Sequence, residues 1–317
     1  MKQRWGIAGT GLIARTMADA LGTIDDAELV AVGSRTDDAA RHFATSYDVP
    51  HAHGSYEALM ADDEVDVVYV ATPTSHHLTH SLAALRSGRH VLCEKAFTAN
   101  AAEAAVLVKA AEQHDRFLME AMWTWFLPAI EQVQQWVAEG RIGDIRVIQA
   151  DFGLRVEATH RRLLDPELAG GSLLDMGIYP VALSRLLLGA PRTVAAVGKL
   201  GTTGVDTNLA AVLGHPDGAV TTFATSLEAD LPKVASIVGT LGTIHLAAPF
   251  FGASSAELII GDHRQIAERP HRGLAHQAEH VMDCIERGLD ESPVLPLATS
   301  VAMMETLDQI RHSAGMG

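Results

Sequence analysis

The first 120 residues alternate short apolar runs with segments in which apolar positions recur every three or four residues. The apolar runs predict strands, at 4–9, 28–33, 65–71 and 90–93. The segments of helical spacing predict helices, at 12–21, 37–45, 77–87 and 99–114. Because parallel strands need helical crossovers, this alternation predicts an α/β fold with a doubly wound parallel sheet.

The pattern changes after residue 120. The β-like runs now follow one another with turn signals between them, at 146–152, 193–200, 208–214, 219–227 and 236–246. Consecutive strands favour an antiparallel or mixed sheet, and helices at 172–188 and 271–287 are expected to interrupt or cover it. We therefore predict two domains, residues 1–120 and 121–317. The second is an α+β domain with a large, mostly antiparallel open sheet.

Charge and cysteine content narrow the class of protein. The 317 residues carry 24 Lys and Arg against 39 Asp and Glu, a formal net charge of −15. An acidic chain repels a phosphate backbone, so we expect no nucleic-acid partner. We also expect no membrane partner, since no run of 18 apolar residues occurs. Two cysteines, Cys93 and Cys284, fit a reduced cytoplasm better than a disulfide framework.

A glycine motif follows the first predicted strand and opens the first predicted helix. Its residues are Gly9, Thr10, Gly11, Leu12, Ile13 and Ala14, a G-x-G-x-x-A pattern. Gly9 permits a tight turn, Gly11 lets the backbone approach a pyrophosphate, and Ala14 allows close helix packing. The helix N-terminus offers N–H groups to the phosphates. The motif therefore predicts a Rossmann-type dinucleotide site.

The end of the second predicted strand indicates which dinucleotide binds. Ser34 and Arg35 stand there, and both can hydrogen-bond a 2′-phosphate, which favours NADP. An NAD site usually has an acidic residue at this point, and NAD remains the weaker alternative. Asp37 and Asp38 fit better as the cap and first turn of the next helix.

Two further segments, 71–77 and 88–95, end the third and fourth predicted strands. In this order they resemble the glucose–fructose oxidoreductase, inositol dehydrogenase and MocA family. There, a Thr-Pro-Asn-x-x-His segment and a Glu-Lys-Pro segment line the cofactor cleft. The matching residues here are Thr72, Pro73, His77, Glu94 and Lys95. Thr74 replaces the asparagine and Ala96 replaces the proline.

Within that family the chain is most similar to the dimeric dihydrodiol dehydrogenases and NADP-dependent D-xylose dehydrogenases. The resemblance rests on residues 119–128, 162–166, 170–180 and 273–281. It departs at Trp125, where such sequences usually carry arginine. It implies a homodimer in which two subunits pack their second-domain sheets together.

Tyr179 is the candidate acid/base. Oxidation of an alcohol needs a group that takes the hydroxyl proton, and a nearby lysine ammonium favours the phenolate form of a tyrosine. The resemblance implies that Tyr179 works with Lys95. Asp175 lies four residues before Tyr179, on the same face if the stretch is helical, and is assigned as a supporting carboxylate.

Aromatic residues and one arginine are the candidates for the substrate site: Trp123, Trp125, Phe152 and Arg155. An apolar wall suits a ring-shaped diol or the flat face of a sugar. We therefore predict an NADP-dependent oxidoreductase that transfers a hydride between the nicotinamide and a secondary or hemiacetal alcohol of a sugar or cyclic trans-diol. The alternative is a non-catalytic NAD(P)-binding regulator of the same fold. Lys95 and Tyr179 favour the enzyme, since a sensor needs no proton-transfer pair.

No metal site is expected. Residues 276–280 form a literal H-x-x-E-H, the inverted zinc-peptidase pattern. Spacing suggests no third ligand, and the segment matches the oxidoreductase family's own C-terminal helix. The histidines at 51, 53, 76 and 80 lack ligand spacing and are interpreted as loop and helix-surface residues.

Overall fold

The structure is a computed structural model that describes residues 2–157 and 159–316. The chain divides into two compact units. The first comprises Met1–Trp123 with Arg272–Val301, and the second comprises Thr124–His271 with Ala302–Gly317. The division after Trp123 lies close to the boundary expected at 120. The segment 272–301 differs from expectation, because it belongs to the first unit and not to the second.

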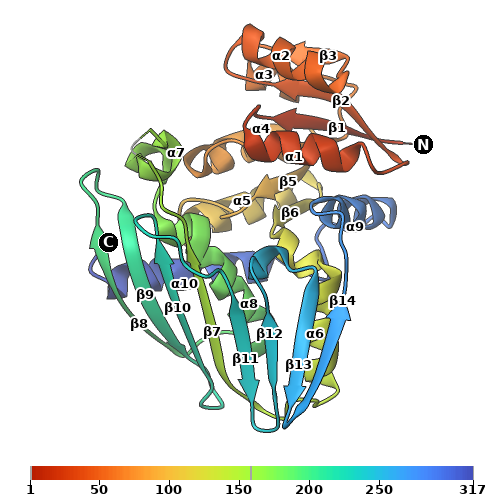
Figure 1. The fold of residues 1–317 in the computed structure, drawn as a ribbon. Coiled ribbons are helices and arrows are strands. Elements are labelled where there is room, and N and C mark those ends of the chain that lie inside the picture. Colours follow the sequence, from red (N-terminus) through yellow and green to blue (C-terminus); the bar gives the residue numbers. More distant parts are fainter. Residues whose placement is uncertain (1, 158, 317) are drawn as a thin grey trace. The chain divides into compact units, whose positions relative to one another are not determined.

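The first unit contains a six-stranded parallel sheet in the order β3-β2-β1-β4-β5-β6 (Figure 1). This order is typical of doubly wound dinucleotide-binding sheets, and it confirms the predicted fold. The direction of winding reverses between β1 and β4, so their carboxyl ends flank the topological switch point. The strands are β1 Gln3–Ala8, β2 Ala27–Gly33, β3 His51–His53, β4 Val67–Val70, β5 His90–Glu94 and β6 Leu118–Ala121.

Several helices of the first unit begin at polar caps. The side chains of Thr36, Ser55 and Asn100 accept backbone N–H groups at the starts of α2, α3 and α5. Strand β3 and helix α3 were not predicted, because each is too short to show a period. The helices include α1 Leu12–Leu21, α2 Asp37–Tyr47, α3 Tyr56–Met60, α4 His77–Arg86, α5 Ala101–His114 and α9 Ala275–Glu286.

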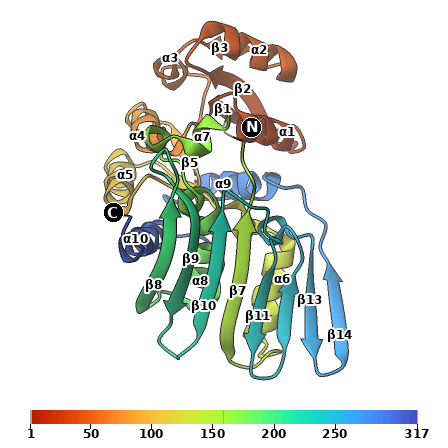
Figure 2. The same ribbon diagram turned by 60° about the vertical axis from the view of Figure 1, so that its left-hand side comes forward.

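The second unit contains an eight-stranded sheet in the order β14-β13-β12-β11-β7-β10-β9-β8 (Figure 2). Strands β7 and β10 are parallel and the other neighbours are antiparallel, which confirms the mostly antiparallel sheet. The strands are β7 Ile145–Gly153, β8 Thr193–Leu200, β9 Asp206–Gly214, β10 Val220–Ser226, β11 Ala235–Gly239, β12 Thr243–Leu246, β13 Ser255–Ile260 and β14 His263–Glu268.

The single strand predicted at 236–246 is wrong, because this stretch forms the β11–β12 hairpin. Ala235 pairs with Leu246, and Val238 pairs with Thr243. The chain turns at residues 240–242, where a Cβ on Gly242 would lie 2.6 Å from the Ile259 carbonyl oxygen. Gly239 and Gly242 lie at the two ends of this turn and are the turn signal in the sequence that the prediction overlooked.

Helices α6 and α8 pack on one face of the eight-stranded sheet (Figure 2). The predicted helix at 172–188 consists of a π-helical segment, Leu173–Gly177, followed directly by α8. Helix α6 was missed, although Pro128 at its first turn is a common helix start. The helices include α6 Pro128–Ala138, α7 Arg161–Leu164, α8 Ile178–Leu188 and α10 Leu297–Ser313, which begins in the first unit and ends in the second.

The stretch Pro166–Leu188 is long and apolar enough to cross a membrane, with a mean hydropathy of 1.2. Its apolar window is nevertheless 72% buried inside the protein. Val181, Ala182 and Leu183 of α8 are among its buried residues. Burial of this kind is typical of a core helix in a soluble protein.

Candidate functional site

The turn between β1 and α1 brings two strands close together at the switch point. Gly9 has a φ of +126°, a conformation that favours glycine. A Cβ at this position would lie 2.7 Å from the carbonyl oxygen of Ala71, just beyond β4. A side chain here would therefore collide with backbone. The predicted role of Gly9 in a tight turn has a direct steric basis.

The start of α1 has the features of a phosphate cradle. Gly11 is the N-cap, it makes no side-chain cap hydrogen bond, and a Cβ on it would meet no atom within 4 Å. The first-turn N–H groups therefore receive no side-chain cap, and uncapped groups of this kind commonly bind an anion. Leu12, the first residue of α1, is 84% exposed although it is apolar, whereas Ala14 lies on the buried face of the helix. These residues fit the pyrophosphate of a dinucleotide.

Ser34 and Arg35 lie at the carboxyl end of β2, in the same strand-end layer. Ser34 is buried, and its N–H donates to the carbonyl of His53 at 3.0 Å, whereas Arg35 is exposed. Asp37 lies in the first turn of α2 and pairs with Arg41 at 2.9 Å. Asp37 and Asp38 thus lie in the first turn as expected, whereas the cap is Thr36. A contact of Arg35 with a 2′-phosphate remains a prediction.

His77 joins the loops that follow β4 and β5. Its Nε2 lies 2.9 Å from the Thr72 carbonyl, and its Nδ1 lies 3.0 Å from the Ala96 carbonyl. Burial lowers the pKa of His77 to about 4, and a neutral imidazole can donate a hydrogen bond to only one of these two carbonyl groups. His77 therefore packs between the loop of Thr72 and the segment that carries Lys95, and it hydrogen-bonds one of them.

Glu94 and Lys95 end β5. The Glu94 carboxylate accepts a hydrogen bond from the hydroxyl of Tyr69 and another from the Lys95 N–H at 3.1 Å. Glu94 is buried and Lys95 is half-buried. The peptide bond between Lys95 and Ala96 is cis. The carboxylate thus holds the backbone from which the lysine side chain extends.

Glu120 was not predicted as a functional residue, although it lies in the same polar cluster. It is fully buried on β6, and its Oε1 accepts the Phe97 N–H at 3.1 Å. Burial raises the pKa of Glu120 to about 7, with the nearby Glu94 charge acting in the same direction. A carboxyl residue within the apolar strand 118–121 was the sequence signal that could have identified it.

In the second unit, Tyr179 lies at the start of α8 within an aromatic cluster. Its ring centroid is 4.8 Å from that of Phe251 and 5.8 Å from that of Phe152, and the two phenylalanine rings stack at 4.3 Å. Tyr179 is 6% exposed, whereas both phenylalanines are half-buried. Phe152 was predicted and Phe251 was missed. The adjacent aromatics at 250–251 were its sequence signal.

Asp175 lies on the π-helical segment just before α8. Its Oδ1 accepts a hydrogen bond from Nη1 of Arg162 at 2.8 Å. This ion pair ties α7 to the segment that leads to Tyr179. The arrangement fits the supporting role expected of Asp175, and it makes Arg162 its partner.

The other predicted substrate residues have different surroundings. Trp125 is 5% exposed, and its indole N–H donates to the Ala182 carbonyl at 3.2 Å, so it packs in the core of the second unit. Trp123 is half-buried in the first unit. Arg155 is exposed on the loop after β7, where its N–H donates to Asp230. Their contacts with a substrate remain predictions.

The candidate catalytic residues are divided between the two units. Lys95 belongs to the first unit, whereas Asp175 and Tyr179 belong to the second. The structure therefore locates each group within its own unit, and the pairing of Lys95 with Tyr179 remains a prediction.

The H-x-x-E-H groups on α9 are engaged in separate hydrogen bonds. His276 Nε2 accepts the Arg272 N–H at 3.1 Å, and Glu279 pairs with the Arg272 guanidinium. His280 Nε2 lies 2.7 Å from the Ser292 hydroxyl. These contacts fit the interpretation of the segment as a structural helix.

Comparison with known proteins covers nearly the whole chain. Residues 3–122 match the model of an oxidoreductase family with an NAD-binding Rossmann fold. Residues 130–245 match that of the GFO/IDH/MocA C-terminal domain. The trans-1,2-dihydrobenzene-1,2-diol dehydrogenase of Bos taurus is 37% identical over an alignment of 331 positions, which covers 100% of this chain and 98% of that protein. The enzyme of that name from Homo sapiens is 36% identical over 330 residues, with the same coverage.

Solved structures show the same architecture. A 3-ketoreductase from Actinomadura kijaniata, in complex with NADP and TDP-benzene, superposes with a TM-score of 0.91 at 27% identity, covering 99% of this chain and 98% of that one. An aldose-aldose oxidoreductase from Caulobacter crescentus also gives a TM-score of 0.91, at 23% identity with the same coverage, and supports the fold alone.

Replacing Glu120 by glutamine should change how stability depends on pH. The folded-state pKa of about 7 exceeds the ordinary value of 4.5, so the folded protein binds this proton more tightly than the unfolded chain. Through this group the parent should lose stability as pH rises from about 5 to 7, by on the order of 3 kcal/mol. Glu120→Gln should lack that loss.

The measurement is the free energy of unfolding in urea at pH 5, 6, 7 and 8. Glu112→Gln, an exposed carboxyl on α5, is the matched control and should follow the parent. Parallel pH curves for Glu120→Gln and the parent would show that Glu120 does not titrate in this range.

Proposed function

Since this chain belongs to the GFO/IDH/MocA oxidoreductase family, we propose that it is an NADP-dependent dehydrogenase of sugars or cyclic trans-diols. Full-length relatives named trans-1,2-dihydrobenzene-1,2-diol dehydrogenase support this substrate class. The observation that carries the proposal is the position of Tyr179, a proton-accepting group set in an apolar aromatic cluster at the start of a buried helix.

The residues of the first unit fit NADP. The Gly9–Gly11 turn leaves room for a pyrophosphate at the α1 N-terminus, and exposed Arg35 offers a cation beside it for the 2′-phosphate. Ser34 adds a hydroxyl at the same strand end. The 3-ketoreductase from Actinomadura kijaniata, described in complex with NADP, supports the same choice. NAD would lose the phosphate contacts and bind more weakly.

In the proposed reaction, the alcohol gives its hydride and its proton to two different acceptors. Bound NADP supplies a nicotinamide that accepts the hydride from the alcohol carbon. Tyr179, as phenolate, accepts the hydroxyl proton while the C–O bond becomes a carbonyl. Lys95 stabilises the phenolate by its charge and orients the hydroxyl, and the Asp175–Arg162 pair holds the helix start that carries Tyr179. The Phe152 and Phe251 rings exclude water from the phenol.

The same aromatic rings suggest the shape of the substrate. Phe152 and Phe251 stack into an apolar surface that matches the flat face of a cyclohexadiene diol or a pyranose.

We propose a homodimer formed through the outer face of the eight-stranded sheet. On strands β11, β7, β10 and β9 this face, opposite α6 and α8, carries mostly uncharged side chains, with the charged Asp151 beside Ala224. The uncharged residues are Val147, Gln149, Ala210, Val212, Val220, Thr222, Ala224, Ser236 and Val238. Such a broad surface of low charge suits a twofold interface between identical sheets. We also propose a cytoplasmic location, since Cys93 and Cys284 are free thiols.

Arg35→Ala should distinguish the two cofactors. Loss of a charge-assisted contact to the 2′-phosphate should raise KM for NADP by about ten- to hundredfold, with little change for NAD. Initial rates at varied cofactor concentration measure this effect. Arg41→Ala, which removes an exposed arginine paired with Asp37, is the control and should leave both constants unchanged. An equal loss for both cofactors would contradict the assignment.

Tyr179→Phe keeps the ring packing and removes the hydroxyl. The oxidation rate should fall by about 10²–10⁴-fold while NADP binding survives. Lys95→Met should lower the rate comparably and shift the pH profile upward, because phenolate forms less readily. The double variant should cost much less than the sum of the two.

The test is the rate at saturating NADP from pH 6 to 10, with trans-dihydrodiols, aldoses and inositols as substrates. Near-parent activity of Tyr179→Phe would assign the proton transfer to another group. Cofactor binding without turnover of any of these substrates would favour the non-catalytic regulator.

Thr222→Glu should separate the dimer into monomers, because it places a charge at the centre of the outer sheet face. Light scattering at micromolar concentration should report a dimer for the parent and a monomer for the variant. Thr202→Glu, in the exposed β8–β9 turn, is the control and should remain dimeric. A monomeric parent would remove the proposal.

A further inference from the structure

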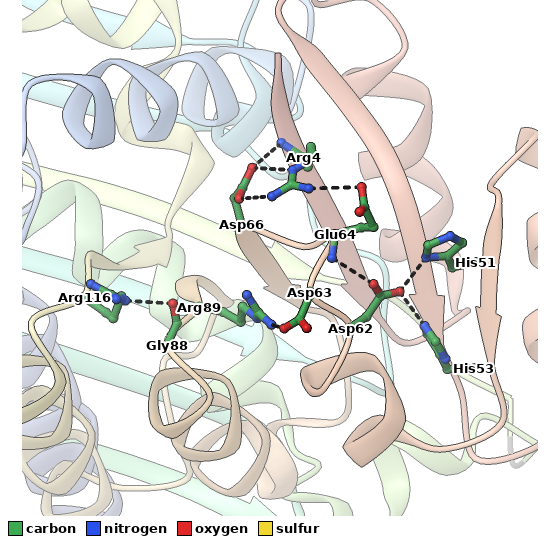
Figure 3. A network of polar contacts seen from close by, with 10 residues as sticks. All are labelled: Arg4, His51, His53, Asp62, Asp63, Glu64, Asp66, Gly88, Arg89 and Arg116. Atoms are coloured by element: carbon green, nitrogen blue, oxygen red, sulfur yellow. Dashed lines mark hydrogen bonds and ion pairs between the residues drawn. The ribbon is translucent and has the colours of Figure 1, made fainter. Parts of the chain in front are cut away.

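Three metal-ligating side chains converge beside the edge strand of the first unit. His51 and His53 are two residues apart on β3, so strand geometry directs both rings to the same side. Nδ1 of His51 and Nε2 of His53 lie 2.7 and 2.8 Å from Oδ2 of Asp62 (Figure 3). The three ligand atoms all lie within 4.8 Å of one another. This corrects the interpretation of the two histidines as residues without ligand spacing.

The Asp62 carboxylate is fixed in place. Its side chain is 7% exposed, and its Oδ1 accepts the Glu64 N–H at 3.0 Å. This contact leaves Oδ2 directed between the two imidazole rings.

The neighbouring acidic residues leave the local charge negative. Asp63 pairs with Arg89 at 3.0 Å, and Arg4 pairs with both remaining carboxylates of the 62–66 segment (Figure 3). Three carboxylates thus share two arginines, and the fourth, that of Asp62, faces imidazoles instead. A divalent cation at the imidazoles would neutralise the excess charge.

We propose that His51, His53 and Asp62 bind a divalent transition-metal ion, of which Zn²⁺ is the representative. Two imidazole nitrogens and one carboxylate oxygen are a common zinc ligand set. Zinc bonds of about 2.0–2.2 Å place ligands roughly 3.4 Å apart, so the two short contacts to Oδ2 need to open only slightly. Each neutral imidazole then carries its proton on the nitrogen facing away.

The position of the site suggests a structural role with an open side. His51 is 41% exposed at the side chain, which leaves room for water to complete the coordination. The ion would join the α3–β4 turn to the short edge strand β3. The His53 carbonyl accepts the Ser34 N–H, so β3 in turn supports the end of β2. We therefore expect metal to stabilise this edge of the first unit.

The test is calorimetric titration of the chelator-treated full-length protein with zinc chloride. Loss of a group that only supports a ligand costs about 10–100-fold in metal affinity. For the site that binds one equivalent of zinc, His53→Ala and Asp62→Asn should therefore bind at least about tenfold more weakly than the parent. His42→Gln, an exposed histidine on α2, is the matched control and should bind as the parent does.

Two further readouts separate ligation from a structural hydrogen bond. Cobalt chloride should give visible absorption bands with the parent and His42→Gln but not with His53→Ala. Zinc should raise the melting temperature of the parent and not that of Asp62→Asn. The proposal would be overturned if the parent did not bind zinc, or if the parent and the three variants bound it equally well. A melting temperature lowered by Asp62→Asn while zinc leaves the parent's unchanged would also overturn it.

Discussion

The close approach of two backbones at the switch point is the constraint on which the first unit depends. Any Cβ on Gly9 would meet the Ala71 carbonyl at 2.7 Å. This spacing lets β1 end in direct contact with the loop after β4. Helix α1 then begins next to the carboxyl ends of both strands. The loops that follow β2, β4 and β5 then form one layer, because parallel strands present their carboxyl ends together.

Buried polar side chains hold this layer in place. His77 lies between carbonyl groups of two loops, Glu94 accepts the Lys95 N–H, and Glu120 accepts the Phe97 N–H. Each is buried, so the loss of one partner would leave another polar group unsatisfied in a dry interior. The residues that support the loops are therefore as tightly constrained as those expected to contact the cofactor.

Local features were predictable from the sequence, whereas long-range ones were not. The glycine turn and the strand ends at Arg35 and Lys95 follow from motifs of a few residues, and the structure has them where we expected them. The Phe152–Phe251 stack, the Glu120 environment and the cluster at Asp62 depend on pairings between distant segments. No spacing along the chain encodes such pairings, because tertiary packing decides them.

The first unit is not continuous in sequence, and this affects how it can fold during synthesis. Strand β6 makes backbone contacts with the returning segment 272–301. Leu118 of β6 donates its N–H to the Asp290 carbonyl at 3.1 Å and forms a β-bridge with Glu291. A ribosome releases these residues only after residues 124–271 have emerged. The nascent first unit must therefore wait with its β6 edge uncovered, and an unpaired strand edge is a template for aggregation. Translation rate and chaperone access, as well as sequence, thus bear on the yield of folded protein.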